Sequence, residues 1–184
     1  FSGELLHFGL GNRFPTWADV VDYLTDPTRT PTADTNTGLL EVAERIATNA
    51  HAGQVDKAGA PYITHPMRVA HRLSSHRPET QAAGWLHDVL EDTPTTSADL
   101  LAAGIPQDVV TAVEVLSRND HDDPEAYYAR IRGNTIALAV KTADIADNTD
   151  PQRVASLDDA TAQRLQSKYE YARCQLGIHD PETD

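Results

Sequence analysis

The stretch WLHDVLED, residues 85–92, sets two polar pairs, His87-Asp88 and Glu91-Asp92, among apolar residues. An α-helix advances by about 100° per residue, so Glu91 would lie about 40° from His87 and Asp92 about 40° from Asp88. All four side chains would then project from less than half of the helix circumference. Three carboxylates so close together repel one another unless a cation or protons lie between them. A divalent ion bound by the His87 imidazole and the Asp88 carboxylate resolves this conflict.

The same stretch has a simpler interpretation, because most His-Asp pairs are solvated residues on the polar face of a helix. Here, apolar residues flank the polar ones on both sides, namely Ala82, Ala83, Trp85, Leu86, Val89 and Leu90. We therefore predict a largely buried helix over residues 79–92. Buried carboxylates without partners are costly. On this helix alone, the structural and the metal-binding interpretations carry equal weight.

The rest of the chain has the periodicity of helices and shows no convincing alternating strand. We predict helices over residues 38–51, from His65 onward, and over residues 158–176, where Gly177 ends the helix. Residues that cap or open further helices are expected at Ser97, Pro106, Asp123 and Asn134. The sequence thus predicts an all-α fold.

The domain boundary follows from a change in composition. Residues 25–36 contain two prolines and five threonines, which is typical of a linker. We predict an N-terminal extension over residues 1–36 and a single helical domain over residues 37–184.

The charge balance limits the kinds of partner. The chain has 184 residues, with 15 Lys and Arg against 28 Asp and Glu, and a net charge of −13. This balance argues against binding to a nucleic-acid polymer or an anionic membrane. No apolar run approaches the length of about 20 residues that crosses a bilayer, and a single cysteine, Cys174, is typical of a reducing cytoplasm. Nothing in the sequence determines an oligomeric state.

Two further sites carry candidate ligands. His65 ends the loop PYIT and begins a helix, where by itself it would be a capping or solvated histidine. Asp144 and Asn148 share one face of an apolar helix at a spacing of four. The simpler interpretation gives Asp144 a structural bond to a neighbouring helix and makes Asp147 and Asn148 a fraying helix end. Neither site is convincing in isolation.

Taken together, the order His65, His87-Asp88 and Asp144 resembles the H…HD…D ligand order of HD-type metal-dependent phosphohydrolases. The resemblance is closest to the RelA/SpoT hydrolase branch, including its small stand-alone members and the metazoan SpoT homologues. The matching strings are HAGQVDKAGAPYITHPMRVA (51–70), GWLHDVLEDT (84–93), VEVLSR (113–118) and VKTADIADN (140–148). Together with the stretch DDATAQRLQSKYEYA (158–172), they cover roughly residues 37–177, about three quarters of the chain. The resemblance implies a single HD-domain helical bundle.

The resemblance also implies a role for each matched residue. One divalent ion, typically Mn²⁺ in that branch, would be bound by His65, His87, Asp88 and Asp144. Glu91 and Asp92 match the catalytic pair that positions or deprotonates the attacking water. Substrate contacts are implied for Lys57, Tyr62, Asn148, Ser117 and Arg118. For Tyr62 a buried structural role remains the alternative, and for Ser117 and Arg118 it is a helix-end cap.

Elementary chemistry agrees with these roles. Two imidazoles and two carboxylates leave positions open on a six-coordinate cation. Water in such a position becomes acidic enough to act as a nucleophile near neutral pH. Phosphoryl-type displacement needs mainly positioning and stabilisation of charge.

The chain departs from the long Rel proteins at two places. Their first motif commonly has an Arg-Lys pair, whereas this chain has Asp56-Lys57, and their last motif commonly reads LADRLHN, where this chain reads TADIADN. Asp56 cannot stack on guanine as a guanidinium does, although its carboxylate can accept hydrogen bonds from guanine. The base preference is therefore left open.

We expect a cytoplasmic hydrolase of small-molecule nucleotides, similar to guanosine-3′,5′-bis(diphosphate) 3′-pyrophosphohydrolase of the stringent response. It would remove the 3′-pyrophosphate of (p)ppGpp-like alarmones and release GDP or GTP. One alternative keeps the chemistry and changes the nucleotide, to an adenine alarmone or to the 2′-phosphate of NADPH. Another is a nucleotide-sensing module without turnover, but a sensor has no need of Glu91 and Asp92.

Overall fold

A computed structural model describes residues 35–56, 59–118, 122–155 and 157–178. Over these residues the backbone is helical and contains no strand, and a single isolated β-bridge joins Val55 to Pro61. The predicted all-α fold is confirmed. The predicted extension, residues 1–36, lies almost wholly outside the described residues, so its boundary stays a prediction.

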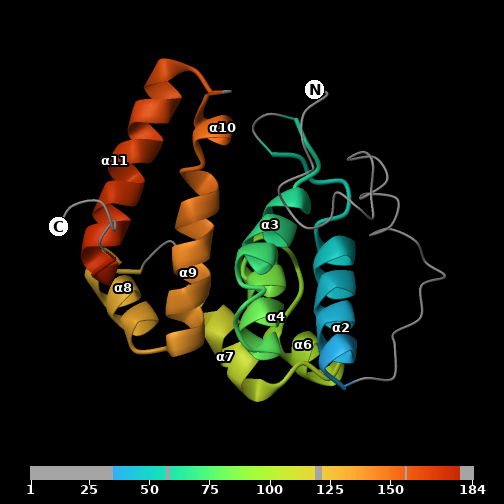
Figure 1. Cartoon of the computed structure of the whole chain (residues 1–184). Helices are drawn as coiled ribbons and strands as arrows, with labels where there is room; N and C mark the ends of the chain where they lie inside the picture. The colour runs from blue at the N-terminus through green and yellow to red at the C-terminus, as the bar shows by residue number, and fades with distance from the viewer. Residues whose placement is uncertain (1–34, 57–58, 119–121, 156, 179–184) are drawn as a thin grey trace.

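The helices follow one another with short connections (Figure 1). They are α2 (Thr35–Ala50), α3 (Thr64–Arg72), α4 (Pro78–Leu86), α5 (Val89–Asp92), α6 (Ser97–Ala102), α7 (Gln107–Leu116), α8 (Pro124–Arg132), α9 (Thr135–Asn148), α10 (Pro151–Val154) and α11 (Asp159–Leu176).

Several helices begin where the sequence predicts a cap. The Asp123 side chain accepts a hydrogen bond from the Ala126 backbone N–H, and Asn134 does the same for Ala137. Such caps satisfy amide groups that have no partner inside the helix. At the other end of the chain, Gly177 closes α11 in the left-handed conformation, with φ of 67°.

The helix predicted over residues 79–92 is not continuous. It is divided into α4 and α5, because Asp88 leaves regular helical geometry with φ of −100° and ψ of −5°. The prediction of one helix was wrong at this point. The break brings the side chains of His87 and Asp88 together, although on a regular helix adjacent residues diverge.

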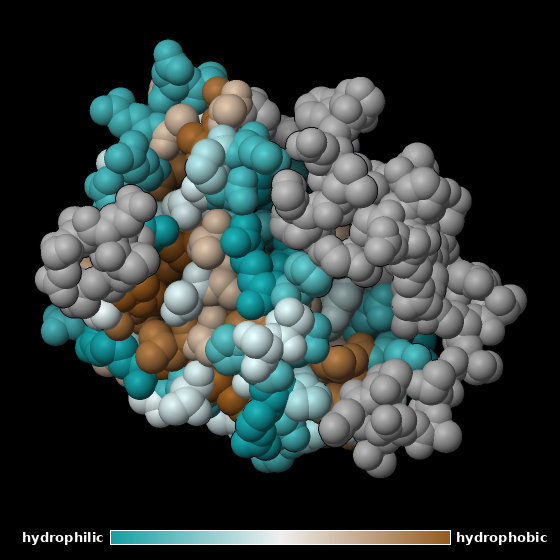
Figure 2. Space-filling model, viewed as in Figure 1, coloured by the Kyte–Doolittle hydropathy of each residue, from teal (hydrophilic) through white to brown (hydrophobic). Residues whose placement is uncertain are grey.

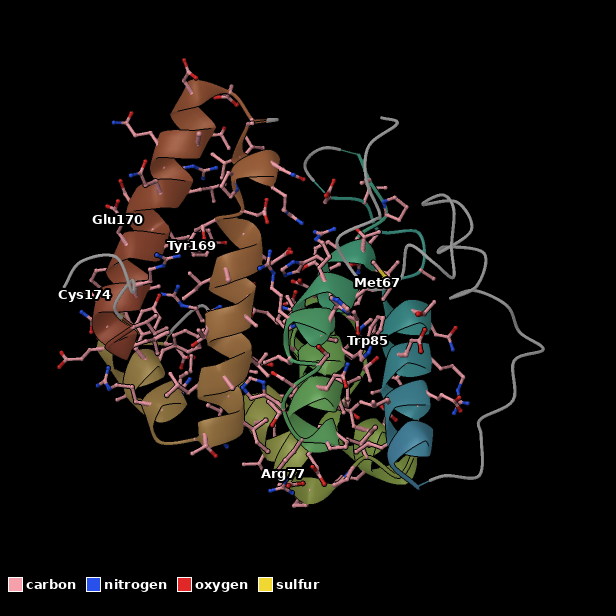
Figure 3. All side chains as sticks on the ribbon, viewed as in Figure 1. Met67, Arg77, Trp85, Tyr169, Glu170 and Cys174 are labelled. Carbon is pink, nitrogen blue, oxygen red and sulfur yellow. The ribbon has the colours of Figure 1, made fainter. Side chains whose placement is uncertain are left out.

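Helix α4 is at the centre of one half of the molecule, where it packs against α2, α3, α7 and α9. Met67 on α3 and Trp85 on α4 are both buried (Figure 3). Gly84 allows α3 and α4 to approach closely, because a Cβ atom there would lie 3.0 Å from the Ala70 Cα and 2.9 Å from Leu73 Cδ1. The start of α3 and the end of α4 are thereby held side by side.

Helix α9 joins this half to the other, because it also contacts α8 and α11. On α11, Tyr169 is buried and points toward α9, whereas Glu170 and Cys174 are exposed (Figure 3). Figure 2 shows hydrophobic side chains gathered near α9 and α11, bordered by hydrophilic ones. None of the described helices is both long and apolar enough to span a membrane.

Candidate functional site

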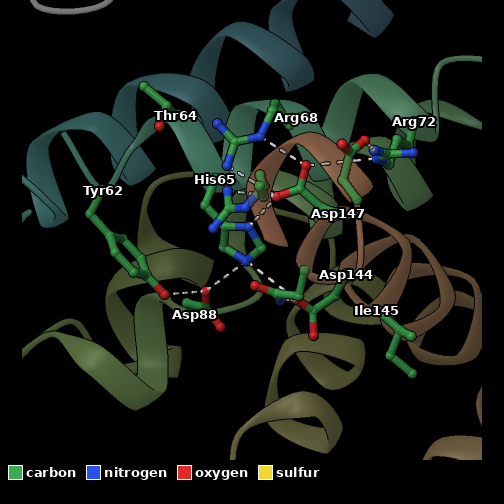
Figure 4. Close-up of polar contacts among 12 residues, drawn as sticks. Tyr62, Thr64, His65, Arg68, Arg72, Asp88, Asp144, Ile145 and Asp147 are labelled. Carbon is green, nitrogen blue, oxygen red and sulfur yellow. Dashed lines mark hydrogen bonds and ion pairs between the residues drawn. The ribbon is translucent and has the colours of Figure 1, made fainter. Parts of the chain in front are cut away.

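The four predicted metal ligands lie together, although they come from three separate segments. His65 is in the first turn of α3, His87 and Asp88 lie between α4 and α5, and Asp144 is on α9. His65 Nε2 is 3.2 Å from Asp144 Oδ1 and 3.7 Å from Asp88 Oδ2. His87 Nε2 is 3.0 Å from Asp88 Oδ2 and 3.9 Å from Asp144 Oδ1. Figure 4 shows His65, Asp88 and Asp144 facing one another.

Both imidazole rings present Nε2 to the carboxylates. His87 Nδ1 donates to the Gly84 carbonyl oxygen at 2.9 Å, and His65 Nδ1 donates to Asp147 Oδ2 at 2.8 Å. His87 Nε2 is buried and makes no hydrogen bond within the described residues, although Asp88 Oδ2 lies 3.0 Å away. A buried ring nitrogen beside two carboxylates suits a metal ligand. One atom each from His65, His87 and Asp144 lie within 4.8 Å of one another, so this donor set fits a divalent ion.

The charges at this site are strongly coupled. Burial opposes protonation of His65, but hydrogen bonds to Asp144 and Asp147 and the nearby negative charges raise its pKa to about 10. Burial likewise opposes protonation of His87, while the charges of Asp88 and Asp144 raise its pKa. Burial alone would raise the pKa of Asp88, but the neighbouring imidazoles hold it well below its usual value. The carboxylates therefore favour positive charge at this position, and a divalent ion can supply it.

Helix α9 adds two side chains that hold the Asp144 carboxylate. Lys141 Nζ donates to Asp144 Oδ2 at 2.8 Å, and Asn148 Nδ2 donates to Asp144 Oδ1 at 2.6 Å. The predicted common face of Asp144 and Asn148 is present, but Asn148 contacts the candidate ligand itself. Lys141 was missed by sequence reasoning, although its position three residues before Asp144 on a helix was a usable signal.

The predicted catalytic pair lies at the edge of the site, and both side chains are exposed. Glu91 Oε2 accepts a hydrogen bond from the Arg118 backbone N–H at 2.8 Å. Partial burial raises the pKa of the Glu91 carboxyl, the Arg118 N–H acts against this, and the negative charges of Asp88 and Asp92 raise it further. A carboxylate with a raised pKa is a stronger base than usual.

Tyr62 connects the candidate ligands to the catalytic pair. Its hydroxyl oxygen is 2.7 Å from Asp88 Oδ2, to which it donates (Figure 4). The same oxygen is 3.2 Å from Asp92 Oδ2. Its ring also lies 4.9 Å from the ring of His51. Tyr62 is thus at the predicted site, where its hydroxyl holds two carboxylates.

For Ser117 and Arg118, the structure shows contacts with other parts of the protein. The Ser117 hydroxyl donates to the Val113 carbonyl oxygen at the end of α7, which agrees with the helix-end alternative. Arg118 contributes its backbone N–H to Glu91, and its exposed guanidinium lies 5.6 Å from the centre of the Tyr127 ring. Lys57 lies outside the described residues.

Sequence reasoning missed Asp147, which is fully buried beside His65. The simpler interpretation placed it at a fraying helix end, but it accepts hydrogen bonds from His65, Arg68 and Arg153. A local signal did exist. Asp147 follows Asp144 by three residues, and Arg68 follows His65 by three, so each pair shares a helix face.

Comparison with known proteins identifies the family of this chain. The HD domain family model matches residues 43–142. The bifunctional (p)ppGpp synthase/hydrolase SpoT of Escherichia coli K12 is 34% identical over 160 residues, which cover 79% of this chain and 23% of the relative. The guanosine-3′,5′-bis(diphosphate) 3′-pyrophosphohydrolase of Vibrio cholerae is 32% identical over 179 residues, which cover 91% of this chain and 23% of the relative. The chain thus spans about a quarter of the length of these curated relatives.

A solved structure supports the fold. It is described as a metazoan ortholog of SpoT that hydrolyzes ppGpp, and it matches with a TM-score of 0.54 and 21% identity, over 82% of this chain and all of the other. At this identity the likeness concerns the fold alone. The family model, in contrast, covers more than half of the 184 residues and includes the His87-Asp88 pair. The chain therefore belongs to the HD-domain family, and within it resembles the SpoT hydrolases.

Proposed function

We propose that this protein is a metal-dependent hydrolase that removes the 3′-pyrophosphate from (p)ppGpp-like alarmones, releasing GDP or GTP and pyrophosphate. The observation that carries the proposal is the convergence of His65, His87, Asp88 and Asp144, with both Nε2 atoms facing the carboxylates. The names of the relatives from Escherichia coli and Vibrio cholerae support the choice of substrate.

The ligand set suits Mn²⁺, because nitrogen and oxygen donors are mixed and four protein ligands leave positions open. When bound, such an ion supplies an acidic water and polarises a phosphate oxygen. Neighbouring groups of the protein orient these ligands through hydrogen bonds. Gly84 holds the His87 ring, and Lys141 and Asn148 hold the two oxygens of Asp144.

Glu91 is the base in this proposal. Because its Oε2 accepts the Arg118 N–H, Oε1 is the atom left to take a proton from the attacking water. The raised pKa of the Glu91 carboxyl favours this transfer near neutral pH. Asp92, linked to Asp88 through the Tyr62 hydroxyl, keeps a second carboxylate beside the site.

The substrate must overcome the negative charge of the protein. A net charge of −13 repels a polyphosphate, so local cations have to offset that field. Lys141 is one such cation, but its ammonium group is already in contact with Asp144. Asn148 lies on the same helix, α9. We propose that Lys57, Arg118 and Asn148 contact the nucleotide.

A second candidate keeps the chemistry and changes the nucleotide, to an adenine alarmone or to NADPH. Asp56 is the observation that favours this second candidate. Its Oδ1 accepts a hydrogen bond from the Ala60 backbone N–H at 2.9 Å and so stabilises the turn that joins Asp56 to Ala60. This oxygen is engaged in the loop, and a carboxylate here cannot stack on a base as an arginine would. We further propose that the protein acts in the cytoplasm, where an exposed thiol such as that of Cys174 stays reduced.

A nucleotide panel tests the proposal. Protein stripped with a chelator is incubated with ppGpp, pppGpp, the adenine analogue ppApp and NADPH, with and without Mn²⁺, and released pyrophosphate and orthophosphate are measured separately. Pyrophosphate from ppGpp that requires Mn²⁺ is the expected result. Orthophosphate from NADPH, or release from ppApp alone, would favour the second candidate. Tight binding of ppGpp without any release would overturn the hydrolase assignment in favour of a sensor.

A further inference from the structure

Asp147 is a fully buried carboxylate directly behind the ring of His65 (Figure 4). Its Oδ2 lies 2.8 Å from His65 Nδ1 and 3.1 Å from a guanidinium nitrogen of each of Arg68 and Arg153. Its Oδ1 accepts from Arg68 Nε at 2.8 Å, and Arg72 Nε is 3.7 Å away. The carboxylate is therefore held from several directions in one orientation.

We propose that Asp147 is a positioning residue for the metal site. A carboxylate only accepts hydrogen bonds, so its contact keeps a hydrogen on His65 Nδ1 and leaves Nε2 as the ligating atom. The arginines in turn hold the carboxylate, so the His65 ring can neither rotate nor change tautomer freely. This inference rests on the metal site of the proposed function and concerns a residue outside its ligand set.

The two candidate histidine ligands are supported in different ways. His87 donates to a neutral backbone carbonyl oxygen, that of Gly84, whereas His65 donates to a charged side chain. A carboxylate on the far nitrogen makes an imidazole a stronger ligand, and such partners affect metal affinity. Asp147 also lies on α9, three residues from Asp144, so one helix supplies a ligand and the support of another ligand on α3.

The competing explanation is that Asp147 only neutralises the partly buried arginines beside it. Asp150 provides a matched control, because it binds Arg72 at 3.0 Å in the same group of charges and makes no contact with His65 that the structure records. Its carboxylate also caps α10, a role that asparagine can keep. A purely structural Asp147 would alter stability without altering metal affinity.

The experiment compares Asp147→Asn and Asp150→Asn with the wild-type chain, each stripped of metal. Mn²⁺ affinity is measured from the electron paramagnetic resonance signal of the free ion, and imidazole ¹⁵N shifts are recorded with diamagnetic Zn²⁺. We expect the Kd for Mn²⁺ to rise about 10- to 100-fold in Asp147→Asn and to stay within about twofold in Asp150→Asn. The ¹⁵N pattern of one histidine should change only in Asp147→Asn.

A second variant keeps the proposal falsifiable if Asp147→Asn does not fold. Asp147→Glu preserves the charge that the arginines need but moves the carboxylate relative to Nδ1, so it should also weaken Mn²⁺ binding. Wild-type affinity and unchanged ¹⁵N shifts in whichever variant folds would overturn the positioning role and leave the proposed function intact. A wild-type protein that binds no Mn²⁺ would instead overturn the metal site and this inference with it.

Discussion

At the residue scale, His65 lies between two carboxylates, with Asp144 on its Nε2 side and Asp147 on its Nδ1 side. These contacts outweigh the cost of burying its charge, so His65 holds a proton near neutral pH, with a pKa of about 10. A metal ion and this proton compete for the same nitrogen. The residue is thus both a candidate ligand and the source of a pH dependence.

Mn²⁺ binding should therefore weaken as the pH falls. Below a pKa of about 10 the metal-free protein carries a proton on His65, which must leave before Nε2 can ligate. We expect binding near neutral pH to release about one proton or more, and the Kd to rise by up to about tenfold per unit of falling pH. Titration calorimetry in buffers of different ionisation enthalpy measures the release. An affinity that is constant over two pH units would contradict this prediction.

Glu91 allows catalysis to be separated from metal binding. Its carboxylate contacts the Arg118 backbone N–H rather than the candidate ligands. In Glu91→Gln we expect turnover to fall by about 100-fold or more, because the base is lost, while the Kd for Mn²⁺ stays near that of the wild type. Steady-state kinetics and Mn²⁺ titration check the two parts. An unchanged turnover would remove Glu91 from the catalytic residues.

At the scale of elements, the site depends on where helices end and how closely they approach. The break after α4 brings His87 and Asp88 onto one site, and Gly84 brings α4 against α3. Gly84 also offers the carbonyl oxygen that orients His87. The position therefore serves packing and ligand geometry together.

Gly84→Ala should destabilise the protein. The added Cβ atom would lie 3.0 Å from the Ala70 Cα, which is backbone and cannot move aside alone. We expect a loss of about 1–3 kcal/mol in the free energy of unfolding, typical of overpacking. Gly133→Ala is the control, because its added Cβ atom would lie 3.4 Å from the Arg130 carbonyl oxygen, an ordinary contact. Equal denaturant midpoints for the two variants would show that the approach of α3 and α4 is not tight.

At the scale of the whole molecule, the candidate site connects segments that are far apart in the chain. Its ligands come from α3, from the α4–α5 junction and from α9, and α9 also contacts α8 and α11. An ion that binds only when these segments are packed together must stabilise the packed state.

Mn²⁺ should therefore raise the thermal unfolding temperature. At a concentration of about 100 times the Kd, we expect about 2.7 kcal/mol of added stability. In Asp88→Ala and Asp144→Ala the shift should disappear together with activity, because each variant loses a ligand. Differential scanning fluorimetry with and without Mn²⁺ measures this, and Asp150→Asn is the control. A full shift in Asp144→Ala would place the ion elsewhere.

The sequence by itself determined the helical class, several helix starts and the four candidate ligands. Helix starts are local, because a cap such as Asp123 or Asn134 acts on amides within one turn. The candidate ligands, two histidines and two aspartates, could be identified from their order along the chain without knowing their arrangement in space. The family resemblance stood on the same residues, and the match to the HD domain confirmed it.

Only the tertiary structure decided which residues support those ligands and the catalytic pair. The sequence alone placed Asp147 at a fraying helix end, whereas packing sets it against His65, 82 residues earlier in the chain. The Arg118 N–H that holds Glu91 comes from 27 residues away, and the break at Asp88 interrupts a run whose periodicity is helical throughout. Helical spacing could place Asp147 on the same face as Asp144, but the distant side chain that each residue contacts is set only when the segments pack together.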